Sequence, residues 1–162
     1  MPAYVAVGSN LDDPRQQVQT ALAHLARLTD CRLVLRSPLY RSAPLVQPGQ
    51  PDQPDFINAV AGMLTRLDPV AMLHALKSLE TSLGRAVPVV RWGPRRIDLD
   101  LLMHGETRVT GEQLTLPHAG VPVRNFVLYP WRAIAPEVHV PGLGRVRDLA
   151  EQVSSQGLEQ VG

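Results

Sequence analysis

The chain has 162 residues, a formal net charge of +1 and one cysteine. This length suits one domain with a substantial core, and we expect a single domain over residues 1–162. The near-zero charge argues against nucleic-acid binding, and the lone Cys31 excludes an internal disulfide and a zinc–cysteine cluster. No apolar run reaches membrane-spanning length and no signal-peptide pattern opens the chain, so we expect a cytoplasmic globular protein with no membrane partner.

The first half of the chain predicts a strand, a helix, a strand, a loop and a strand, in that order. These are an apolar run that ends in glycine (3–8), a helix opened by Asp13 and Pro14, an alternating strand interrupted near Pro38 (32–41), a proline-rich loop (43–55) and a long strand (56–67). The Asp-Pro pair is typical of a helix N-terminus, because the carboxylate caps backbone amides and proline suits the first turn. Proline-rich loops exclude regular structure, and long loops often cover a site.

The second half repeats the helix-start signal at Asp68-Pro69, and this helix is expected to end near Leu83. The remaining expected elements are a loop (84–94), a strand that carries two aspartates (97–102), a turn (104–106), an irregular stretch (114–124), a helix broken by Pro130 (125–135), a hairpin (141–144) and a terminal helix (146–153). Two strand–helix–strand units joined by hairpins predict an α+β sandwich, with a mostly antiparallel sheet and helices packed on it.

Residues 91–102 contain the most informative pattern. Asp98 and Asp100 alternate with apolar residues, so in a strand both carboxylates point to one face while the apolar side chains enter a core. Two carboxylates on an apolar strand are costly to desolvate unless cations meet them. A pair of Mg²⁺ ions beside Arg91 and Arg95 meets that need and indicates phosphate chemistry. A solvated pair of carboxylates, or a structural ion-pair network with the arginines, fits the same spacing.

Six motifs, in order and over nearly the whole chain, resemble the 6-hydroxymethyl-7,8-dihydropterin pyrophosphokinase family. They are VAVGSNL (5–11), YRSAPL (40–45), QPDFINA (53–59), Glu80 with Gly84-Arg85, RWGPRRIDLDLL (91–102), and LTLPH with RNF (114–118 and 124–126). The resemblance implies a ferredoxin-like fold and an enzyme that transfers pyrophosphate from ATP to a pterin alcohol and releases AMP, in tetrahydrofolate biosynthesis. It implies small-molecule partners only, and we expect a monomer.

The resemblance also implies roles for the matching residues. Asp98 and Asp100 would bind two Mg²⁺ ions and form the catalytic set with Arg95, and Asp98 would also contact the attacking hydroxyl. The residues expected to bind ATP are Glu80, Arg85, Arg91, Arg95, Leu101, Thr115, His118 and Arg124. The residues expected to bind the pterin are Ser42, Ala43, Leu45, Phe56, Asn58, Trp92, Asp98 and Phe126, with the two phenylalanines as stacking plates.

The sequence departs from better-known bacterial members of that family beside several of these positions. Phe56 replaces a tyrosine, which removes a hydroxyl and keeps the stacking face. Val87 and Pro88 replace basic side chains, so ATP binding or loop closure would depend more on Arg85, Arg91 and Arg95. Gln113 and Ala119 replace an arginine and a tyrosine, which leaves the nucleotide contacts on that side open.

Two other functions fit part of the pattern. A metal-dependent nuclease or nucleotidyltransferase can use paired aspartates, but it would need a broader basic surface and a third carboxylate. An RNA-binding module could use Arg91, Trp92, Arg95 and Arg96, with stacking from Phe56. The acidic pair and near-zero net charge argue against it. Neither a P-loop nor a dinucleotide-binding motif is present, which disfavours ordinary kinases and dehydrogenases of those types.

Overall fold

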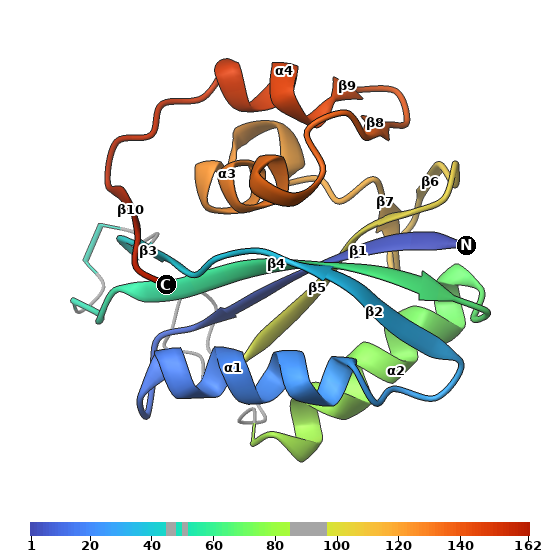
Figure 1. Ribbon diagram of the computed structural model, residues 1–162, viewed down its shortest axis with the longest axis horizontal. Helices are drawn as coiled ribbons and strands as arrows, with labels where there is room; N and C mark the ends of the chain where they lie inside the picture. The colour runs from blue at the N-terminus through green and yellow to red at the C-terminus, as the bar shows by residue number, and fades with distance from the viewer. Residues whose placement is uncertain (45–47, 50–51, 85–96) are drawn as a thin grey trace.

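A computed structural model of the protein describes residues 1–44, 48–49, 52–84 and 97–162 (Figure 1). The elements along the chain are β1 (Pro2–Ser9), α1 (Pro14–Leu25), β2 (Cys31–Arg36), β3 (Tyr40–Ser42), β4 (Phe56–Thr65), α2 (Pro69–Ser82), β5 (Asp98–His104), β6 (Val109–Thr110), β7 (Thr115–Leu116), the 3₁₀ turn η1 (Val121–Val123), α3 (Asn125–Ile134), β8 (His139–Val140), β9 (Gly144–Arg145), α4 (Val146–Glu151) and β10 (Leu158–Gln160). No helix among these residues is both long and apolar enough to cross a lipid bilayer.

The main sheet is antiparallel and has the strand order β10–β3–β4–β1–β5. Strand β2 also pairs with β4, because β3 occupies the start of β4 and β2 its later residues. The central strands are therefore β1 and β4. Their pairing places the N-terminal strand beside residues 56–65. The order β1-α1-β2-β4-α2-β5 and this pairing give the ferredoxin-like α+β fold, which confirms the predicted fold class.

Helices cover both faces of the sheet (Figure 1). Helices α1 and α2 lie on one face, where their apolar side chains pack with alternate residues of β1, β4 and β5 in one buried cluster. Helices α3 and α4 lie on the other face and pack in a second cluster around Trp131. The ring centroids of Trp131 and Tyr4 lie 5.1 Å apart. Because side chains alternate along a strand, each central strand contributes to both clusters.

The two Asp-Pro signals begin helices as predicted. The carboxylate of Asp13 accepts the backbone N–H of Gln16 at 3.4 Å, and that of Asp68 accepts the N–H of Ala71 at 2.8 Å. Proline occupies the next position in each helix, where a backbone N–H has no partner within the helix. Local chemistry therefore sets both helix starts.

Two predictions for the C-terminal third were wrong. The stretch 114–124 is not irregular throughout, because it contains β7 and η1. Helix α3 is not broken at Pro130: the helix continues through it, since burial of Val127, Leu128 and Trp131 outweighs one lost backbone hydrogen bond. The pattern also gave no sign of β10, a short strand that adds to β3 at the edge of the sheet.

Candidate active site

Asp98 and Asp100 lie on β5 and face the α3/α4 side of the sheet. Both are half-buried, whereas Leu99 and Leu101 between and after them are buried in the α1/α2 cluster, as the alternation predicted. In the ladder between β1 and β5, Asp98 pairs with Gly8 and Asp100 pairs with Ala6. The shift in the β1–β5 register comes after these pairs, so both aspartates stand in regular sheet.

One row of residues connects the aspartates to the strand predicted to bind the pterin. Asp98 pairs with Gly8, and Gly8 in turn pairs with Asn58 on β4. A Cβ on Gly8 would lie 3.2 Å from Oδ1 of Asn58 and 3.8 Å from the ring of Phe56, so both side chains lie against this glycine. Two strand spacings put Asp98 about 10 Å from Asn58 along the row. The row brings the predicted metal and pterin positions to one face.

Asn58 is fixed by a buried hydrogen bond. Its Nδ2 donates to Oγ of Ser42 at 2.7 Å, and the two residues are only 4% and 5% exposed. Ser42 pairs with Phe56 in the β3–β4 ladder, and the exposed Ala43 follows it. Four of the predicted pterin contacts therefore lie together at the start of β4.

Asn10 anchors the segment that leads into this strand. Its side chain is 1% exposed and donates to Oε1 of Gln53 at 3.1 Å and to the carbonyl of Pro54 at 3.2 Å. The end of β1 is thereby tied to the residues just before Phe56. Asn10 was part of a matching motif, but no local pattern assigned it this role.

Glu80 reaches β5 from α2. Its carboxylate is 1% exposed, accepts the backbone N–H of Leu99 at 2.7 Å and lies 3.4 Å from Nζ of Lys77. Its predicted ATP contact stays a prediction. The observed hydrogen bond gives Glu80 a second role, because it holds the strand at the residue between the two aspartates.

His118 lies close enough to Asp100 for their charges to interact. Burial lowers the pKa of His118 below its ordinary value of 6.5; Asp100 opposes this, and the cations of Arg124 and Lys77 reinforce it. The backbone N–H of Gly120 donates to Nδ1 at 3.0 Å, which leaves the proton of the neutral ring on Nε2. His118 can therefore act as a neutral hydrogen-bond donor.

Arg124 and Phe126 stand at the N-terminal end of α3. The guanidinium carbon of Arg124 lies 5.8 Å from the ring centroid of Phe126, within range of a cation–π contact. A Cβ on Gly120 would lie 2.5 Å from Nε of Arg124. Glycine at this position therefore leaves the space that the arginine side chain occupies. Since α3 packs on β4 and β3, the predicted pterin plate Phe126 lies on the same face as Asn58.

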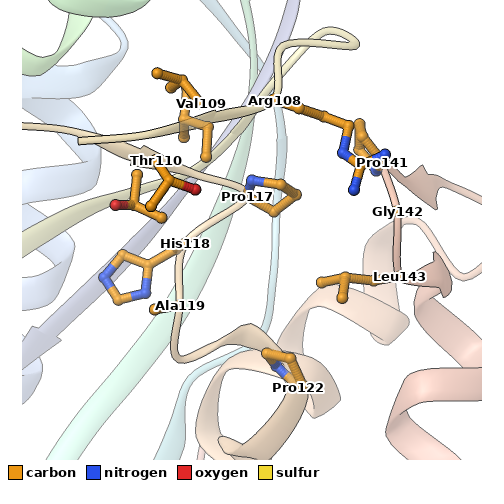
Figure 2. A pocket seen from close by; sticks show the side chains of 12 residues that line it. Arg108, Val109, Thr110, Pro117, His118, Ala119, Pro122, Pro141, Gly142 and Leu143 are labelled. Carbon is orange, nitrogen blue, oxygen red and sulfur yellow. The ribbon is translucent and has the colours of Figure 1, made fainter.

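The β6–β7 hairpin supplies Thr115. With His118 it lines a pocket of about 490 Å³ that extends to the β8–β9 turn (Figure 2). The side chain of Leu101 is buried on the other face of the sheet, so any nucleotide contact of this residue would be through its backbone. Gln113, one of the departures from the family pattern, contacts Nε2 of His74 on α2 at 2.8 Å.

Five predicted contacts lie outside the described residues: Leu45, Arg85, Arg91, Trp92 and Arg95. Parts of the predicted loops 43–55 and 84–94 lie outside them as well. The structure therefore describes the sheet and α3 sides of the candidate site.

The carboxylate pair suits magnesium that is shared with a nucleotide. Among the described residues, no three His, Cys, Asp or Glu side chains form a metal-binding group. Mg²⁺ commonly takes only one or two carboxylates from a protein and completes its shell with phosphate oxygens and water. Two half-buried carboxylates on one strand face fit that coordination, and they do not fit an all-protein cage.

Comparison with known proteins decides the family. A family model described as 7,8-dihydro-6-hydroxymethylpterin-pyrophosphokinase (HPPK) matches residues 4–136. The chain belongs to this family. It is accordingly an enzyme, a transferase of the pyrophosphokinase type, which confirms the resemblance found in the sequence.

Relatives of this HPPK chain span several groups of organisms. The 2-amino-4-hydroxy-6-hydroxymethyldihydropteridine pyrophosphokinase of Pseudomonas aeruginosa is 44% identical over 158 residues, covering 98% of this chain and 95% of the relative. The protein of that name from Haemophilus influenzae is 40% identical, covering 93% and 91%. Folic acid synthesis protein fol1 of Schizosaccharomyces pombe is 37% identical over 96% of this chain, which spans 21% of that longer protein.

Solved structures support the fold. Wild-type HPPK-DHPS of Plasmodium falciparum with pteroate has a TM-score of 0.72 and 14% identity, and the match covers 93% of this chain. This chain spans 42% of that longer one. At this low identity the likeness concerns the fold alone.

Proposed function

We propose that this HPPK chain transfers pyrophosphate from ATP to the hydroxymethyl group of 6-hydroxymethyl-7,8-dihydropterin and releases AMP, as a step in tetrahydrofolate biosynthesis. The observation that carries the proposal is the row Asp98–Gly8–Asn58, which joins an acidic pair to a buried amide across three strands. Its two ends suit the two halves of the reaction, polyphosphate at the carboxylates and a heterocycle at the amide.

The pterin half uses stacking and edge recognition. Phe56 and Phe126 would sandwich the flat ring, and Asn58, held by Ser42, would bond its polar edge. Ala43 and Leu45 would add backbone contacts, and Trp92 would close over the ring. A prearranged amide favours binding, because its orientation need not be ordered when the substrate arrives.

The nucleotide half uses charge and hydrogen-bond donors. Arg124 and the Nε2–H of His118 would contact the triphosphate beside Asp100, together with Arg85, Arg91 and Arg95. Thr115 and the backbone of Leu101 would contact the nucleoside, and Glu80 would contribute from α2. Neutral His118 can donate this hydrogen bond through Nε2 without carrying a charge.

Asp98 and Asp100 would hold two Mg²⁺ ions, which when bound neutralise the polyphosphate and help to ionise the attacking hydroxyl. In the transfer, the hydroxymethyl oxygen bonds to the β-phosphorus while the bond from that phosphorus to the α–β bridging oxygen breaks. AMP leaves with the bridging oxygen, and Asp98 or water accepts the hydroxyl proton. Arg95 would stabilise the transferring group, because positioning and charge neutralisation dominate such reactions.

We propose further that one domain over residues 1–162 performs this reaction as a cytoplasmic monomer with no nucleic-acid or membrane partner. The modest net charge of +1 supports the absence of a nucleic-acid role.

A coupled assay for AMP tests the function. AMP should form from ATP only when both Mg²⁺ and 6-hydroxymethyl-7,8-dihydropterin are present, and one pterin pyrophosphate should form for each AMP. AMP formation without the pterin alcohol, or ADP as the nucleotide product, would contradict the proposal. Isothermal titration adds a binding test: the pterin should bind tightly only with Mg²⁺ and a non-hydrolysable ATP analogue.

A further inference from the structure

The pocket beside Thr115 and His118 extends well beyond them. It lies between the β6–β7 hairpin, the segment that follows β7, and the β8–β9 turn (Figure 2). Its volume of about 490 Å³ falls within the usual range for small-molecule sites. Three of its lining residues are Pro117, Pro122 and Pro141, whose fixed backbone angles make the walls stiff before any ligand arrives.

Arg108 gives the outer end of the pocket a positive charge. Among the described residues that line the pocket none is Asp or Glu, and no described carboxylate lies within salt-bridge distance of Arg108. Some other surface arginines are paired, such as Arg41, which lies 3.5 Å from Glu159. The guanidinium at the pocket is therefore available to an outside anion.

Gly142 lets the guanidinium lie against the β8–β9 turn. A Cβ at this position would come within 2.6 Å of Nη2 of Arg108, and the residue has a φ of +76°, which glycine adopts without strain. Arg108 belongs to the residues just before β6, so this contact joins the two hairpins. The charge is thereby set at the mouth of the pocket.

The pocket also leaves apolar surface in water. Val109 on one hairpin is 40% exposed, and Leu143 on the other is 39% exposed. Both line the pocket with the three prolines. These two partly exposed side chains, one from each hairpin, offer contacts to the apolar body of a small ligand.

We propose that this pocket binds a small organic anion, with its carboxylate or phosphate on Arg108 and a flat apolar body between the prolines, Val109 and Leu143. A guanidinium pairs with either anion through two parallel hydrogen bonds. The inner end reaches His118 and Ala119, next to the proposed nucleotide contacts, so the ligand would lie beside the reaction centre. This site goes beyond the proposed transfer and does not require it.

Methyl NMR with 2-naphthoate tests the proposal, in the absence of nucleotide, pterin and Mg²⁺. The methyl signals of Val109 and Leu143 should shift saturably, with a dissociation constant of roughly millimolar order for one bidentate ion pair and one buried ring system. The neutral 2-naphthamide has the same shape and should bind at least about tenfold more weakly. A parallel titration with 2-naphthyl phosphate identifies the preferred anion, and tighter binding of either one supports the site.

The substitution Arg108→Met should weaken 2-naphthoate binding by about tenfold or more. The matched control Arg66→Met removes an exposed arginine from the turn between β4 and α2 and should leave binding unchanged. Amide spectra of both variants should match the parent away from the substitution. Absence of saturable shifts with both anions, or equal binding by Arg108→Met, would overturn the proposal whether or not the chain is an active pyrophosphokinase.

Discussion

The carboxylate of Glu80 accepts the backbone N–H of Leu99 at 2.7 Å, at the residue between Asp98 and Asp100. Strand β5 lies at the edge of the main sheet in the described part of the chain, and this N–H donates to a side chain from α2 and not to a further strand. Lys77, one turn earlier on the same helix, lies 3.4 Å from the other carboxylate oxygen. Helix α2 thereby fixes the strand from which both proposed metal ligands project.

Replacing Glu80 should alter the magnesium requirement. Glu80→Leu leaves the buried N–H of Leu99 unpaired, which costs about 1–3 kcal/mol of stability, and it frees the strand edge to move. We expect a lower melting temperature and a roughly tenfold higher Mg²⁺ concentration for half-maximal activity, equivalent to about 1.4 kcal/mol. Glu80→Gln keeps an acceptor oxygen and should restore the normal Mg²⁺ requirement. If Glu80→Leu had the Mg²⁺ requirement of the parent, the hydrogen bond of Glu80 would contribute to stability alone and not to metal binding.

Asp98→Asn and Asp100→Asn should each abolish most turnover. Losing a carboxylate ligand removes several kcal/mol of charge stabilisation, so the catalytic constant should fall by roughly a thousandfold or more. Both side chains are half-buried and outside the main core, so melting temperatures should change little. Asp148→Asn, on the exposed face of α4, is the control and should remain active. Near-normal activity in both site variants would contradict the proposal that these two carboxylates bind Mg²⁺.

Phe126→Ala and Arg95→Ala should separate substrate binding from catalysis. Loss of the stacking ring should raise the KM for the pterin, by about 1–3 kcal/mol of binding free energy, with a smaller effect on kcat. Loss of the guanidinium should mainly lower kcat, because it would act on the transferring group. Val123→Ala, which trims a side chain that is 74% exposed near the start of α3, should alter neither parameter. Equal changes in both parameters for both variants would contradict this division.

Gly8→Ala should weaken pterin binding and leave the magnesium requirement unchanged. The added Cβ would lie 3.2 Å from Oδ1 of Asn58, a contact close enough to push the amide by a few tenths of an ångström. The expected result is a KM for the pterin raised several-fold, because a misplaced hydrogen-bond partner costs about 1 kcal/mol. Gly162→Ala, distant in the chain and with only ordinary contacts of 3.5 Å or more to Leu39 for the added Cβ, controls for the glycine change itself. A normal pterin KM would show that Asn58 tolerates the displacement.

His118 should make stability depend on pH. Its pKa is lowered by burial from 6.5, so the unfolded chain takes up the proton at a higher pH than the folded one. The stabilising contribution is therefore complete above pH 6.5 and is lost as the pH falls through the lowered value. Protonation of Nδ1 would also remove the acceptor used by Gly120.

Urea unfolding at several pH values measures this effect. The free energy of unfolding of the parent should fall relative to that of His118→Gln as the pH drops below 6.5. His24→Gln changes an exposed histidine on α1 and should follow the parent. A difference between the parent and His118→Gln that stays constant with pH would contradict the assignment.

Local patterns in the sequence determined the helix starts, the faces of the strands and the position of the acidic pair. Asp13 and Asp68 act within three residues of themselves, so their role can be read without the rest of the chain. The alternation around Asp98 and Asp100 follows from the two-residue period of a strand and needs no knowledge of its neighbours. Those signals are local, and the structure confirmed them.

Only the tertiary structure decided which distant segments meet. Gly8 lies between Asp98 and Asn58 because of strand order and register, and no single segment encodes either. The bond from Leu99 to Glu80 and the continuous helix through Pro130 likewise depend on packing between segments far apart in the chain. Such contacts form because the helices and the sheet bury their apolar faces against one another. That packing depends on the whole fold and not on any local pattern.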